Sequence, residues 1–146
     1  MDFFSAMDIS ASALAAERTR MNLISSNLAN VNSTRTAEGG PYRRKDAVFT
    51  ATAPNQGKGS FQSTLGNAMK ARTVEVSEIV EDQKPPRMQY EPNNPDANAA
   101  GYVAYPNVNV VEEMADMISA SRSYEANVTA TQAAKSMALK TLEIGR

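Results

Sequence analysis

The sequence predicts a mainly α fold, in which long N- and C-terminal helices pack as a coiled coil and enclose a small β-rich or irregular middle segment. All seven prolines and six of the seven glycines lie between residues 39 and 106, so both ends of the chain lack helix breakers. Apolar side chains also recur about every seven residues in both ends, the spacing of helices that pack along one another. We therefore expect an N-terminal helical segment at 1–38, a middle segment at 39–106 and a C-terminal helical segment at 107–146.

The N-terminal segment is expected to form one helix over residues 5–31. A narrow apolar stripe of this kind is the seam along which one helix packs on another. Its expected members, spaced by heptads in two positions, are Met7, Leu14, Met21 and Leu28, and then Ile24 and Val31. The helix should end within 30–34, where short polar side chains compete with the backbone for hydrogen bonds.

The middle segment contains two stretches with the composition of β-strands, at 42–51 and 73–80. Residues 85–106 are rich in proline and asparagine, which disfavours regular structure. We expect them to form an extended strap, held by the aromatic anchors Tyr90, Tyr102 and Tyr105 because a tyrosine combines an apolar ring with a polar tip.

The C-terminal segment is expected to form the longest helix, over residues 108–144, with Asn107 or Asn109 as its N-terminal cap. Its seam alternates steps of three and four residues and has polar exceptions at Ser121 and Lys135. Its expected assembly residues are Met114, Met117, Tyr124, Val128, Ala138 and Leu142. A helix of this length would span about 55 Å. Because the small middle segment cannot cover such a stripe, we expect the N-terminal helix and other chains to cover it.

The composition excludes several classes of function. The chain has no cysteine and no histidine, so it can form no disulfide, thiolate nucleophile, Cys/His zinc site or Ser-His-Asp triad. Its net charge of −1 is spread evenly, which disfavours binding to nucleic acid or anionic lipid. No apolar run reaches the roughly 18 residues of a membrane span, and no cleavable signal peptide is visible. We expect no catalytic residue, no cofactor, no metal site and no small-molecule substrate.

Two charged clusters have plain structural interpretations. Residues 43–45, Arg-Arg-Lys, are interpreted as the solvated edge of a strand rather than a nucleic-acid patch. Glu112, Glu113 and Asp116 are interpreted as the acidic start of a helix, where the helix dipole favours negative charge, rather than as a cation site.

Several motifs resemble a known family. Residues 12–22 and 24–32 are similar to the N-terminal signature of bacterial flagellar rod and hook proteins. A further resemblance, to the short proximal rod subunits of that family, lies in residues 41–45, 90–95, 101–114, 119–127 and 140–145. Where the general rod and hook motif continues into Thr-Thr-Gly and an aromatic residue, this chain has Ser33, Thr34 and Arg35, which favours the short proximal type.

The resemblance implies a structural protein without enzymatic activity. Members of the family are exported through the flagellar type III apparatus without a cleaved signal, and they polymerise into the periplasmic drive shaft of the basal body. The implied partners are further copies of the chain and other proteins of the proximal and distal rod. The residues alone leave open a second hypothesis, a soluble coiled-coil adaptor whose middle segment is a small β module that binds peptides. An enzyme ranks third, because no constellation of acid, base and nucleophile is visible.

Overall fold

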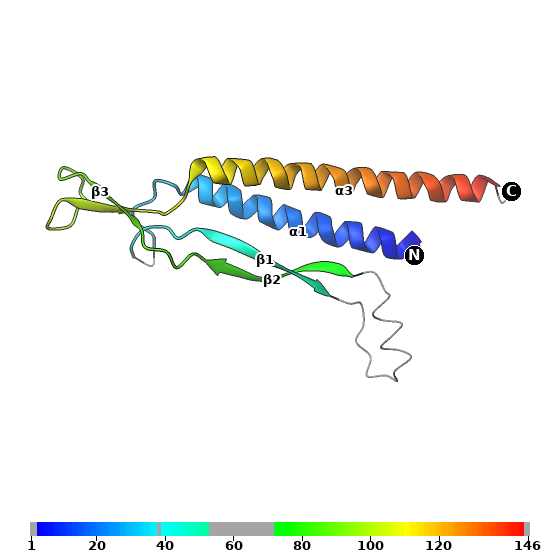
Figure 1. Cartoon of the computed structure of the whole chain (residues 1–146), viewed down its shortest axis with the longest axis horizontal. Helices are drawn as coiled ribbons and strands as arrows, with labels where there is room; N and C mark the ends of the chain where they lie inside the picture. The colour runs from blue at the N-terminus through cyan, green and yellow to red at the C-terminus, as the bar shows by residue number, and fades with distance from the viewer. Residues whose placement is uncertain (1–2, 38, 53–71, 145–146) are drawn as a thin grey trace, which may run out of the picture.

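The computed structural model describes residues 3–37, 39–52 and 72–144, and it is elongated (Figure 1). Two long helices, α1 (Phe3–Ala29) and α3 (Val110–Ile144), lie side by side and run in opposite directions. The predicted helices are thus confirmed, with boundaries that move by about two residues. Both chain termini lie toward one end of the pair, and the connections to the middle segment lie at the other end.

The ends of the helices follow from side-chain hydrogen bonds. Asn109 caps α3, because its Oδ1 accepts the backbone N–H of Val111 at 3.1 Å. At the end of α1, the Asn30 amide donates to the Ser26 carbonyl at 2.9 Å and competes with the backbone. Because α1 ends at Ala29, Val31 lies in the following turn and not in the helix that the heptad pattern predicted.

Strands β1 (Lys45–Thr52) and β2 (Thr73–Glu81) form an antiparallel ribbon whose register pairs Lys45 with Glu81. The ribbon lies along α1 on the side away from α3, so that α1 is the middle of three layers (Figure 1). Among the described elements, α3 packs against α1 alone. Both predicted strands are confirmed. Residues 53–71, which show no clear pattern in the sequence, lie outside the described part of the chain.

Strands β3 (Arg87–Tyr90) and β4 (Tyr102–Tyr105) form a hairpin that projects beyond the ends of both helices (Figure 1). The extended strap expected over 85–106 is therefore corrected: the chain folds back on itself. The physical reason is local. Asn94 accepts the N–H of Asp96, and Asn98 accepts those of Ala100 and Tyr102, so asparagine side chains close the turns between the strands.

Fully buried side chains are few for a chain of this length. The buried apolar residues of the described part are Ala16, Ile24, Val103, Val108 and Ala120. Many large apolar side chains are exposed instead, among them Val111, Met114, Ile118, Met137 and Leu142 on α3. Within the described residues, neither helix combines the length and the apolar character needed to cross a membrane.

Candidate assembly interface

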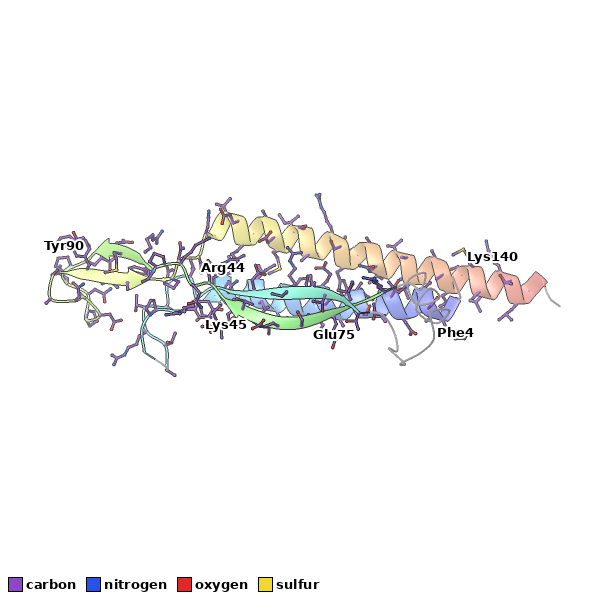
Figure 2. The ribbon with its side chains drawn as sticks, turned by 60° about the horizontal axis from the view of Figure 1, so that its bottom comes forward. Phe4, Arg44, Lys45, Glu75, Tyr90 and Lys140 are labelled. Atoms are coloured by element: carbon purple, nitrogen blue, oxygen red, sulfur yellow. The ribbon has the colours of Figure 1, made fainter. Side chains whose placement is uncertain are left out.

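A buried polar cluster joins the three layers where α1 ends, β1 begins and α3 begins. We define it as Asn27, Tyr42, Arg44 and Glu113. Figure 2 shows Arg44 and Lys45 at this junction. Asn27 and Glu113 are each only 1% exposed, which is unusual for a polar and a charged side chain. Such groups must find hydrogen-bond partners inside the protein.

The Asn27 amide uses its full hydrogen-bonding capacity. Its Nδ2 donates to the Lys45 carbonyl at 2.9 Å and to Glu113 Oε2 at 3.0 Å. Its Oδ1 accepts the Lys45 N–H at 3.0 Å and the Tyr42 hydroxyl at 2.9 Å. An asparagine side chain offers two donors and two acceptor positions, so all four are occupied. One side chain thereby ties α1 to the first residue of β1 and to the first turn of α3.

Glu113 receives a second partner from the chain before β1. Arg44 donates through Nε to Glu113 Oε1, and through Nη1 to Asp46 Oδ2 at 3.1 Å. Its Nη2 lies 3.7 Å from Asp116 Oδ2. Burial lowers the pKa of Arg44, but the hydrogen bonds and charges of Glu113 and Asp46 more than offset this, so the pKa stands above its ordinary value. The guanidinium therefore stays charged and balances the buried carboxylate.

The interpretation of residues 43–45 is corrected here, while that of the acidic helix start is confirmed by Glu112 and Glu113 in the first turn of α3. Arg44 is half-buried and paired rather than part of a solvated strand edge, although Arg43 is exposed. Glu113 is a buried partner of Arg44 and Asn27, whereas its neighbour Glu112 is exposed, as a helix-start charge should be. No group of carboxylates in the described residues could hold a metal ion. Both the basic residues of 43–45 and the Glu112–Glu113 pair are visible in the sequence. Their contact could not be predicted, because Arg44 and Glu113 are 69 positions apart and no periodic pattern connects them.

On α3, one series of buried or half-buried positions recurs three and four residues apart, and Asp116, Ser121, Ser123 and Val128 beside it are half-buried as well. The series is Glu113, Met117, Ala120, Tyr124, Asn127, Thr131, Ala134 and Ala138. The predicted seam uses two heptad positions on α3. The series keeps the position that contains Met117 and Tyr124, and its other members, such as Ala120, lie one residue before the second predicted position. At this second predicted position, Val128 is half-buried, while Met114 and Leu142 are 54% and 71% exposed. The predicted apolar face is therefore wider than α1 covers.

On α1, the predicted seam is less exposed. Ile24 is fully buried, and the side chains of Met7, Leu14, Met21 and Leu28 are half-buried, as is Val31 beyond the helix end. The C-terminal end of α3 projects past the beginning of α1 (Figure 1), and Leu142 in the last turn of α3 is exposed. Figure 2 shows Phe4 and Lys140 near this end of the molecule. That the predicted seam residues of α1 and α3 contact other chains stays a prediction.

The three tyrosines expected as anchors occupy the hairpin. Tyr90 and Tyr102 pair across β3 and β4, with ring centroids 5.3 Å apart in an edge-to-face arrangement. Their contact holds the two strands of the hairpin together, while both side chains remain exposed, Tyr90 to 63% and Tyr102 to 43%. Tyr105 donates its hydroxyl to Glu91 Oε2 at 3.1 Å, and this bond raises the pKa of the phenol. Sequence reasoning missed the asparagines that order the loop.

Comparison with known proteins places both ends of the chain in flagellar families. A family described as flagella basal body rod protein matches residues 7–35, and one described as flagellar basal body rod FlgEFG protein C-terminal matches residues 99–144. The first range contains Asn27 and the second contains Glu113, so the polar cluster joins the two matched segments.

Relatives cover the chain over its whole length. The flagellar basal-body rod protein FlgC of Bacillus subtilis (strain 168) is 47% identical over 156 residues, which span all of both chains. The protein of that name from Salmonella typhimurium is 44% identical, again over all of both chains. That of Borreliella burgdorferi is 43% identical over 99% of this chain and 98% of its own. The chain therefore belongs to the FlgC family of flagellar basal-body rod proteins.

Proposed function

We propose that this chain is a structural subunit of the proximal flagellar rod, which polymerises through its terminal helices into the drive shaft that transmits torque. The observation that carries the proposal is the long helix pair, in which α3 exposes large apolar side chains near both of its ends. Val111 is 75% exposed on the first turn of α3, and Leu142 is 71% exposed on the last. Exposed apolar residues along 35 residues of helix are costly for a monomer and suit a subunit that packs against neighbours.

Coiled-coil packing between helices is the finer part of this proposal. The buried positions of α3 keep the spacing of three and four that a coiled coil requires. The adjacent heptad position, which contains Met114, Val128 and Leu142, would then pack against helices of neighbouring subunits. A stiff wall follows, because each helix would be held on more than one side.

The remaining parts of the proposal concern partners and place. The subunit would contact copies of itself and other rod proteins of the proximal and distal rod. It would leave the cytoplasm through the flagellar type III apparatus without a cleaved signal peptide and would act in the periplasm without enzymatic activity. No observation favours the alternative of a soluble adaptor, because the described strands form two separate two-stranded ribbons rather than a closed peptide-binding module.

Val128 offers a direct test. An aspartate at this half-buried position would introduce a charge into the proposed contact, whereas Thr129, its exposed neighbour, should tolerate the same change. Each variant would replace the chromosomal copy in a flagellated host that depends on this gene. We expect Val128→Asp to be made and exported but to leave cells without complete basal bodies in electron micrographs, and Thr129→Asp to assemble normally. Normal rods and motility with both variants would contradict the proposed contact.

A further inference from the structure

The contact surface between α1 and α3 combines small side chains with larger ones such as Met117, Tyr124 and Ile24, all at heptad positions. Alanines occupy Ala120, Ala134 and Ala138 of the buried series on α3, and Ala16 is buried on α1. Two helices with a heptad spacing can slide by seven residues, about 10 Å, and present the same faces to each other.

We infer that the polar cluster is a register lock, which admits one axial alignment of α1 and α3 and excludes the alignments that the alanines would tolerate. Glu113 is the decisive residue, because it is a carboxylate in a position that the heptad reserves for an apolar side chain. In the observed register it accepts hydrogen bonds from Asn27 and Arg44. A single buried polar residue at a heptad core position is a known means of fixing the register of paired helices.

A slide in either direction breaks these contacts. If α3 moves by one heptad toward the hairpin, Ala120 takes the place of Glu113, and the second donor of the Asn27 amide loses its acceptor. If α3 moves the other way, Glu113 comes opposite Arg20, which lies one heptad before Asn27. Arg20 supplies charge there, and it already lies 4.0 Å from Asp116, but it brings neither the Asn27 amide nor Arg44. The second alignment is thus the competitor that the lock must exclude.

The inference concerns the isolated chain and does not depend on the proposed function. Because the chain has no cysteine, two spin labels can be attached at introduced cysteines without background. Asn22 and Gln132 are both exposed, one on each helix, and they are offset along the pair. A slide of one heptad would therefore change the distance between the labels by most of 10 Å. Pulsed electron–electron double resonance measures the distribution of the distance between the two labels.

Glu113→Leu is the variant to test, and Glu112→Leu is its matched control, since it removes the same charge from the exposed neighbouring position. In Glu113→Leu, Asn27 keeps its bonds to Lys45 and Tyr42, so the junction retains its other ties. We expect one narrow distance in the parent and in Glu112→Leu, and a second, displaced population in Glu113→Leu at unchanged helix content.

A single unshifted distance in Glu113→Leu would overturn the inference, because the connection or the seam would then fix the register without the cluster. More than one distance in the parent would overturn it as well. If Glu113→Leu loses helix content in circular dichroism, Glu113→Gln takes over the test. It keeps the side-chain length and an acceptor for Asn27 but removes the charge that faces Arg44. A displaced population in that variant supports the lock, and an unchanged distribution contradicts it.

Discussion

Asn27→Asp should be the most damaging conservative substitution in this chain. The new side chain has nearly the same shape, but it carries a negative charge and has no donor in place of Nδ2. The Lys45 carbonyl and Glu113 Oε2 would each lose the hydrogen bond that Nδ2 now donates. Two carboxylates would also lie about 3 Å apart at a position that is 1% exposed.

The magnitude follows from these contacts. A buried acceptor left without its donor costs about 1–3 kcal/mol, and more when it is charged. Two such acceptors and the repulsion between the carboxylates give about 3–6 kcal/mol, after allowing for Arg44 and for the N–H of Lys45 that still stabilise negative charge. Small domains have a free energy of unfolding of about 5–15 kcal/mol, so much of the stability would be lost.

Urea unfolding of the parent and the variant, followed by circular dichroism at 222 nm, measures this difference. Asn22→Asp is the matched control, because it makes the same change at an exposed position of α1 and should alter the free energy of unfolding by less than about 0.5 kcal/mol. The part of the loss in Asn27→Asp that comes from charge should shrink as the pH falls toward the usual pKa of aspartate, about 4, because burial and Glu113 favour the neutral form of the new carboxyl in the folded state. A loss below about 1 kcal/mol at pH 7 would refute the claim that the amide holds the three layers together.

Three further predictions follow from other parts of the structure. Gly101→Ala should destabilise the hairpin by about 1–3 kcal/mol, because φ is +79° and an added Cβ would lie 2.8 Å from the Tyr90 ring; hydrogen exchange of the hairpin amides measures this. Tyr105 should titrate above the usual range in ultraviolet absorbance at 295 nm, and Glu91→Gln should lower its pKa. The hydrogen bond from Tyr105 to Glu91 raises the folded-state pKa of Tyr105. The stability that this bond contributes is therefore present below about pH 10 and is lost as the pH rises through the folded-state pKa. Leu28→Asp should block rod assembly without preventing export, which motility and periplasmic fractionation would show, and motile cells would contradict it.

The helices and the β1–β2 ribbon could be predicted because their signals are local. The distribution of glycine and proline separated the two helical ends from the middle segment, apolar spacing and short polar side chains placed the helix bounds within about two residues, and β-branched residues marked both strands. The hairpin could not be predicted by the same reasoning. Prolines and asparagines at 92–98 forbid regular structure in the loop, but they say nothing about the pairing of Arg87 with Tyr105 across it.

The candidate site was predictable only in part. Heptad spacing predicted Met117, Tyr124 and Ala138 as assembly residues; they are half-buried within the chain, and their contact with other chains stays a prediction. It could not decide which neighbouring position completes the seam, because alanine and a buried glutamate gave no apolar signal at Ala120 and Glu113. The wider apolar face, with Met114 at its edge, remains available to other chains.

By itself, the sequence determined that this chain has two helical ends, a turn-rich middle and the signature of a rod subunit. These features follow from local backbone preferences and from the spacing of side chains on one helix, which any folded form of the chain must respect. Only the tertiary structure brought Asn27, Arg44 and Glu113 together from three distant segments. A buried charge is tolerated only where hydrogen-bond partners lie beside it, and the position of those partners depends on the path of the whole chain.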